Sequence, residues 1–141
     1  MVRIAICGAA AAVLAVAANS QPAETFEYRY GAGPGPAFCG IPATSLADVA
    51  KAMTPLWERS ADPSHAEITF MRASGEVTIY VTMTTPSNPA HPAAFCREAS
   101  SIKGKSIEHW RVICEGPRAA CDAYAADLKP AYDATVSARQ P

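Results

Sequence analysis

The stretch Ala66–Thr84, AEITFMRASGEVTIYVTMT, decides the fold, because apolar and polar residues alternate on both sides of Ser74-Gly75. Alternation with a period of two is typical of a half-buried β-strand, and two such runs around a glycine-containing pair predict a β-hairpin. A two-residue turn at Ser74-Gly75 pairs four apolar residues on one face, Ile68 with Val81 and Phe70 with Ile79. The other face then carries Thr69, Met71, Thr78, Tyr80 and Thr82.

A second pair of strands is predicted from Phe95 to Ile102 and from Ser106 to Cys114, around Lys103-Gly104-Lys105. If Lys105 is central to a three-residue connection, Cys96 lies opposite Cys114. One face then carries Cys96, Ile102, Trp110, Val112 and Cys114. The other face carries Phe95, Arg97, Ile107, His109, Arg111 and Ile113.

Two helices are predicted, one before and one after these strands. The first is capped at Thr44 or Ser45, and its apolar residues recur every three or four positions until Pro55 interrupts the pattern. The second opens at Gly116-Pro117 and carries an apolar stripe in which Pro130 predicts a kink or a division.

The segment before the first helix is less regular. Phe26, Tyr28 and Tyr30 alternate as they do in a half-buried strand, so Glu24–Tyr30 predicts either a strand or an ordered arm. The glycines and prolines of Gly31–Pro36 predict a loop.

Together these elements predict an α+β fold. We expect a two-layer sandwich with a helix, a four-stranded antiparallel meander and a C-terminal helix, both helices packing on the same face of the sheet. The N-terminal segment is a candidate fifth strand. The predicted division of the chain is a signal peptide over 1–20, an N-terminal arm and Gly/Pro loop over 21–43, the α+β domain over 44–138 and a tail over 139–141.

The first twenty residues predict export. Arg3 precedes an apolar run from Ile4 to Ala18 that is shorter than the ~20 residues of a membrane span, and small residues near positions 17 and 20 suit cleavage at either point. The alanine-rich leader and the absence of an N-x-[ST] acceptor favour a bacterial periplasmic or secreted protein with no membrane span after cleavage.

Charge and cysteine content narrow the class of protein. The chain has 12 basic and 13 acidic side chains, and neither sign forms a block, which gives no support to a nucleic-acid partner. Export leaves four cysteines for two disulfides. We expect Cys96–Cys114 with Cys39–Cys121, and Cys39–Cys96 with Cys114–Cys121 is the alternative. The cysteine and histidine spacings predict no metal site.

The functional hypothesis is a binding or interaction module whose ligand is a protein or an envelope macromolecule. If both helices cover one sheet face, the other stays open, with aromatic, methionine and arginine side chains of the kind favoured at interfaces. This open face would carry Met71, Tyr80, Phe95, Arg97, His109, Arg111 and Ile113. No cofactor fingerprint and no catalytic motif such as G-x-S-x-G occurs, and the sequence indicates no oligomeric state.

The alternative hypothesis is a small secreted hydrolase of the phosphodiesterase or ribonuclease kind. Such enzymes use a carboxylate, a histidine and arginines on an antiparallel sheet, and His109 with Arg97 or Arg111 offers part of this set. The neighbouring glutamates, Glu98 and Glu108, are expected to point to the face opposite His109.

Overall fold

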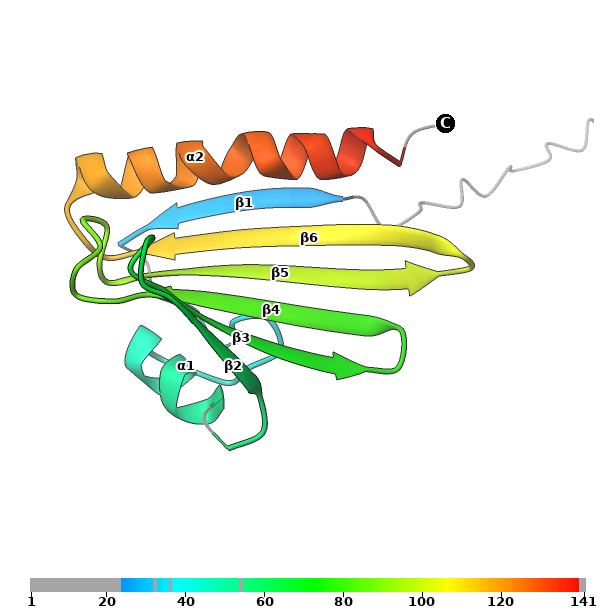
Figure 1. The fold of residues 1–141 in the computed structure, drawn as a ribbon, viewed down its shortest axis with the longest axis horizontal. Helices are drawn as coiled ribbons and strands as arrows, with labels where there is room; N and C mark the ends of the chain where they lie inside the picture. Colours follow the sequence, from blue (N-terminus) through cyan, green and yellow to red (C-terminus); the bar gives the residue numbers. More distant parts are fainter. Residues whose placement is uncertain (1–23, 32, 36, 54, 140–141) are drawn as a thin grey trace, which may run out of the picture.

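The computed structural model describes residues 24–139 except 32, 36 and 54, so the predicted signal peptide lies outside the described residues. The described residues form two helices and six strands, whose arrangement can be followed in Figure 1. The strands are β1 (Thr25–Tyr30), β2 (Glu58–Asp62), β3 (Glu67–Ser74), β4 (Val77–Thr84), β5 (Ala93–Ile102) and β6 (Lys105–Cys114). The helices are α1 (Leu46–Met53) and α2 (Arg118–Ser137).

The six strands form one mixed sheet in the order β1-β6-β5-β4-β3-β2. β3 to β6 form an antiparallel meander, while β1 pairs with β6 in parallel. The α+β class is therefore confirmed, and the four-stranded, all-antiparallel sheet is wrong. β2 was missed because all five of its residues are exposed and polar or small, so it has no apolar alternation to reveal it.

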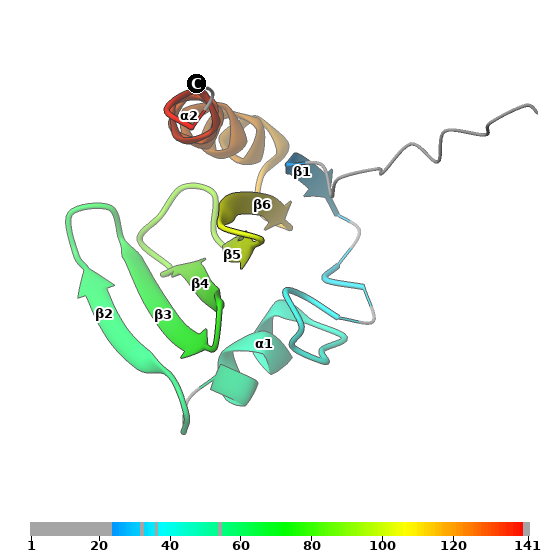
Figure 2. The ribbon, with the colours of Figure 1, turned by 90° about the vertical axis from the view of Figure 1, so that its right-hand side faces the viewer.

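The helices lie on opposite faces of the sheet, which corrects the expected two-layer arrangement (Figure 2). α1 and the loop before it cover one face, here called the α1 face, to which Phe70, Val81 and Cys96 point. α2 runs along β1 and β6 on the other side, the α2 face. The predicted arm over 21–43 contributes β1 to the sheet and Phe38 and Ile41 to the core.

The first hairpin keeps its predicted faces although its pairing differs. The turn lies at Gly75-Glu76, where Gly75 adopts a φ of 59°, and Phe70 pairs with Val81 rather than with Ile79. A register shift of two residues leaves every side chain on its own face, because side chains alternate with a period of two.

The second hairpin exchanges its predicted faces. Its turn has two residues, Lys103 and Gly104, so Ile102 pairs with Lys105 and Cys114 pairs with Ala93. The register differs from the expected one by an odd number of residues, which turns β5 over relative to β6. Phe95 and Arg97 consequently share the α2 face with Trp110.

The same exchange explains the disulfides. All four cysteines of the described residues are paired, as expected, but the bonds are Cys39–Cys96 and Cys114–Cys121. The favoured bond between Cys96 and Cys114 is wrong because Cys96 points to the α1 face and Cys114 to the α2 face.

Local hydrogen bonds position both helices, and a disulfide also anchors α2. The Ser45 hydroxyl accepts a hydrogen bond from the Asp48 amide at 3.1 Å, which caps α1.

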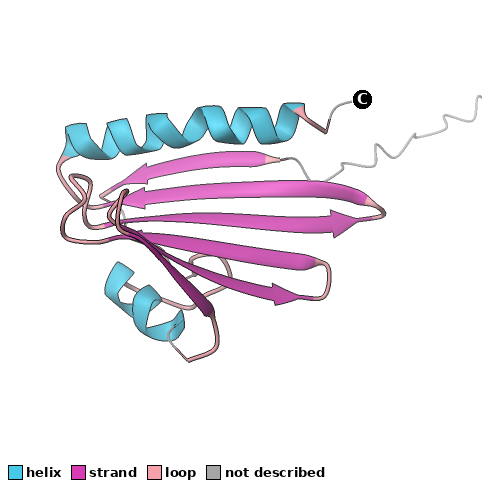
Figure 3. Ribbon diagram, in the orientation of Figure 1, coloured by secondary structure: helices cyan, strands magenta, loops and turns pink. Residues whose placement is uncertain are grey.

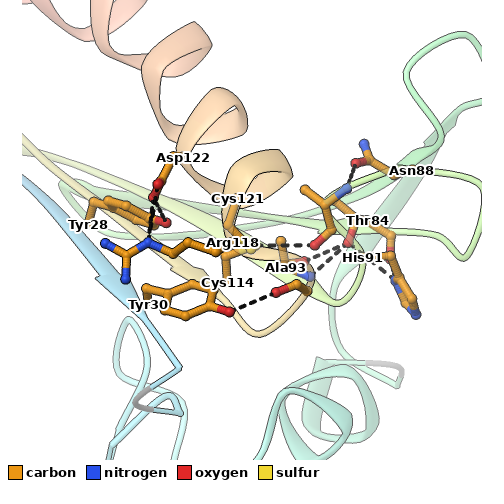
Figure 4. Close-up of a disulfide and its surroundings, with 12 residues drawn as sticks. Tyr28, Tyr30, Thr84, Asn88, His91, Ala93, Cys114, Arg118, Cys121 and Asp122 are labelled. Atoms are coloured by element: carbon orange, nitrogen blue, oxygen red, sulfur yellow. Dashed lines mark hydrogen bonds and ion pairs between the residues drawn. A yellow bond between two sulfur atoms is a disulfide. The ribbon is translucent and has the colours of Figure 1, made fainter.

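α2 continues through Pro130 as one long helix (Figure 3). Its first turn is held by Cys114–Cys121 and by Asp122, whose carboxylate accepts from the Tyr28 hydroxyl at 2.7 Å (Figure 4). Burial and Asp122 raise the pKa of Tyr28 to about 12.

Two apolar layers stabilise the sheet. On the α1 face, Phe38, Val49 and Met53 are fully buried against the strands. On the α2 face, the rings of Trp110 and Tyr132 pack edge to face with their centroids 5.6 Å apart, and aromatic packing continues on both sides. The Phe26 ring packs against Tyr132, and the Phe95 ring packs against Trp110.

We predict that Phe70→Ala lowers the free energy of unfolding by about 3–5 kcal/mol, because it leaves a cavity beneath α1. Thr69→Ala on the adjacent α2 face should cost about 1 kcal/mol, since it removes one hydroxyl contact with Thr82. Urea unfolding of both variants measures the difference. A cost at Thr69 equal to that at Phe70 would contradict the assignment of faces.

We also predict that the oxidised mature protein, which lacks Cys7 of the predicted signal peptide, has no reactive thiol under denaturing conditions and that peptide mapping recovers both bonds. The two cysteines of Cys39–Cys96 are 57 residues apart and those of Cys114–Cys121 only 7, so the first bond constrains the unfolded chain more. Replacing the first pair by alanines should cost about 2 kcal/mol more than replacing the second pair. Equal costs would argue against this entropic account.

Candidate functional site

The seven residues predicted for an open face do not share one surface. Met71, Tyr80, Phe95 and Arg97 lie on the α2 face, whereas His109, Arg111 and Ile113 lie on the α1 face. Ile113 is fully buried in the core. Each sheet face must therefore be considered separately.

On the α2 face, the Arg97 side chain contacts several neighbouring side chains of the sheet. Met71, Tyr80, Arg97 and Trp110 are successive cross-strand neighbours from β3 to β6. The Arg97 guanidinium lies 5.5 Å from the Tyr80 ring centroid and 5.7 Å from that of Trp110. It also donates two hydrogen bonds of 2.8 Å to Glu108. Arg97 is therefore held in this row by an ion pair and by two aromatic rings.

Glu108 is the centre of a buried charge network that the sequence did not predict. Its side chain is 1% exposed, and its carboxylate also accepts hydrogen bonds from the Trp110 indole at 2.8 Å and from Arg139 at 2.6 Å. Burial acts to raise the pKa of Glu108, but the hydrogen bonds from Arg97, Trp110 and Arg139 outweigh it and the pKa is lowered. The network ties the end of α2 to the sheet, and Glu24 completes it by accepting from Arg139 at 3.1 Å.

On the α1 face, His109 and Arg111 line a cavity of about 170 Å³, which we call the His109 cavity. Strands β1, β5 and β6 supply its floor and the turn after the Gly/Pro loop supplies a wall. The remaining lining residues are Thr25, Glu27, Ala37, Cys39, Gly40, Glu98 and Trp110.

The wall of the His109 cavity is fixed by covalent and hydrogen bonds. Phe38 and Ile41 exchange backbone hydrogen bonds of 2.8 and 2.9 Å, and the two residues between them adopt positive φ angles, 51° at Cys39 and 73° at Gly40. The Cys39–Cys96 disulfide joins this turn to β5. The position of the wall is thus set before any ligand arrives.

Some polar side chains that line the cavity have a hydrogen-bond partner, and one carboxylate has none among the described residues. Arg111 donates a hydrogen bond of 3.1 Å to Glu27, so these two charges compensate each other. The Nδ1 atom of His109 lies 3.0 Å from the Thr25 hydroxyl. Glu98 is directly opposite His109 across the strand pair, is half-buried, and its carboxylate makes no hydrogen bond or ion pair with a described residue.

The position of Glu98 corrects the expectation that both neighbouring glutamates turn away from His109. Glu98 and His109 share the α1 face because β5 is turned over, while Glu108 and Arg97 lie on the other face. The sequence held one usable signal. Glu98 is two residues after Cys96 on the same strand, so it shares the face on which Cys39–Cys96 closes the turn.

A serine, a histidine and an aspartate also meet at the β2–β3 turn, but their geometry is that of a turn and not of a nucleophilic triad. The His65 Nδ1 atom lies 2.7 Å from Asp62 and 3.1 Å from the Ser64 hydroxyl, so one nitrogen faces both partners. In a triad the two contacts use opposite ring nitrogens. Hydrogen bonds from Ser64 and His65 lower the pKa of exposed Asp62 to about 2.

No protein-family model, curated protein or solved structure matches this chain. Within the described residues, no three His, Cys, Asp or Glu side chains are grouped as metal ligands. Neither described helix is long and apolar enough to cross a membrane. The His109 cavity, in contrast, brings a histidine, an arginine and two glutamates together.

We predict that Glu108→Gln lowers the free energy of unfolding by about 3–5 kcal/mol at pH 7, because it leaves Arg97 and Arg139 without their buried counter-ion. The lowered pKa of Glu108 means that the contribution of its charge is present above the pKa of an unfolded glutamate. It is lost as the pH falls through the folded pKa, so the difference between the two proteins should shrink in acid.

Denaturant unfolding between pH 7 and pH 3 measures this effect, with Glu98→Gln as the matched control. Glu98 is on the neighbouring strand and has no charge partner within the part of the chain that the structure describes, so its substitution should change stability by less than about 0.5 kcal/mol. Equal losses in the two variants would contradict the network.

Proposed function

We propose that the chain is an exported, disulfide-stabilised binding module of the bacterial envelope or secretome that recognises its partner at the His109 cavity. The observation that carries this proposal is the cavity itself: its wall is held by Cys39–Cys96, and the carboxylate of Glu98 inside it has no partner among the described residues. A rigid concave site with an uncommitted polar group is what a binding surface requires.

The dimensions of the cavity favour a macromolecular partner. Sites for cofactors and other small molecules enclose about 300–1,000 Å³, whereas this cavity measures about 170 Å³. A space of that size accepts one side chain or one small head group and leaves the rest of the ligand outside. We therefore propose a protein or envelope macromolecule that inserts a single group.

Two features support the proposed location and class of partner. Both disulfides are compatible with an oxidising compartment such as the periplasm or the extracellular space, to which the predicted signal peptide would direct the chain. The near-neutral net charge supports neither a nucleic-acid partner nor an anionic membrane surface.

A phosphodiesterase or ribonuclease activity is the second candidate, favoured by the shared position of Glu98, His109 and Arg111 on one cavity. Two observations favour the binding module over this hydrolase activity. The lining carries two carboxylates and one guanidinium, which disfavours a phosphodiester anion. Among the described residues, the His109 ring forms its one hydrogen bond with Thr25 and not with a carboxylate that would orient a general acid or base.

The test is capture of partners from a cell-envelope extract by the immobilised, oxidised protein. Ala37→Trp places a large ring at the cavity and should abolish the captured band, whereas Ala52→Trp on the exposed side of α1 should leave it unchanged. Retained capture by the Ala37 variant would remove the cavity as the binding site. Cleavage of an RNA oligonucleotide that disappears in His109→Ala would replace the binding module with the hydrolase.

A further inference from the structure

We infer that the group inserted into the His109 cavity is the cationic end of a lysine or arginine side chain, with Glu98 as its counter-ion. This inference rests on the proposed function and names the chemistry of the partner at the same site. The inference is based on the ion pairs of the three charged side chains that line the cavity, Glu27, Glu98 and Arg111, because only two of them pair with each other.

Among the carboxylates that line the cavity, Glu98 is the one without a cation of the described residues in contact. Arg111 donates a hydrogen bond of 3.1 Å to one carboxylate oxygen of Glu27. The Nε atom of Arg29 lies 3.8 Å from the other oxygen of the same carboxylate. Glu98 has no such partner among the described residues. A ligand cation would supply the counter-charge that this half-buried carboxylate lacks among the described residues.

The groups around Glu98 suit a donor-rich ligand. With Nδ1 of His109 engaged by Thr25, the Nε2 atom is the ring nitrogen that has no described partner. In the neutral tautomer that donates from Nδ1 to Thr25, Nε2 accepts a hydrogen bond. An ammonium or guanidinium group offers several N–H donors, enough for Glu98 and for this nitrogen.

The wall of the cavity suits the remainder of such a side chain. Ala37 and the disulfide-bonded Cys39 present apolar atoms beside the polar floor. Lysine and arginine place an aliphatic stem along apolar surface while the charged end meets a polar group. The cavity volume admits one side chain of this kind and excludes a whole peptide or nucleotide.

The test uses the oxidised full-length mature protein and four small probes, followed by backbone amide chemical shifts. The probes are the Nα-acetyl methylamides of lysine, arginine and norleucine, together with inorganic phosphate. We expect lysine or arginine to shift the amide signals of Gly40, Glu98 and His109 at millimolar concentration. Norleucine has the aliphatic chain of lysine without its charge and should leave these signals unchanged.

Glu98→Gln should weaken binding of the cationic probe at least tenfold, because it removes the counter-ion and keeps the shape. Glu76→Gln, in the exposed turn between β3 and β4, is the matched control and should bind as the wild type does. Comparing lysine with arginine identifies which cation the cavity prefers.

Several outcomes would overturn the inference. Absence of binding by both cations, equal binding of norleucine, or undiminished binding by the Glu98 variant would each exclude a charge-paired cation. Phosphate that shifts the same amides would show an anion site instead. If Ala37→Trp still abolishes partner capture in any of these cases, the binding module stands and only its ligand chemistry fails.

Discussion

The two-residue turn at Lys103-Gly104 is the constraint on which the rest of the structure depends. Both residues adopt positive φ angles, 52° and 75°, which is the backbone of the tightest hairpin connection. The turn fixes the register of β5 against β6, and register decides which side chains of the two longest strands share a face. A connection longer by one residue would exchange the positions of Glu98 and Arg97.

That register separates two environments that differ in chemistry. On the α2 face, Arg97 and Trp110 come together around Glu108, and α2 closes the network with Arg139. On the α1 face, Cys96 reaches the turn at Cys39 and thereby builds the wall of the His109 cavity. One disulfide therefore serves the cavity, while the other anchors the first turn of α2.

Local patterns predicted what depends on neighbours in the sequence. The alternation around Phe70 and Tyr80 gave the correct faces of β3 and β4, and Ser45 was correctly placed as a cap of α1. The β5–β6 register depended on a loop length that spacing alone left open, and the disulfide pairing and the side of the sheet covered by α2 followed from it. β2 carries no apolar alternation, so only its pairing with β3 reveals it.

The contrast between Glu108 and Glu98 is the strongest functional signal in the fold. Both are glutamates on adjacent strands, yet Glu108 receives hydrogen bonds from two arginines and an indole, whereas the carboxylate of Glu98 has no described partner. Structural stability explains the first arrangement, because an uncompensated buried charge is costly. Glu98 is only half-buried, so its unpaired carboxylate carries a smaller cost, and no structural contact of the described residues offsets it. A carboxylate kept unpaired inside a rigid cavity is therefore explained best by a cation from outside the chain.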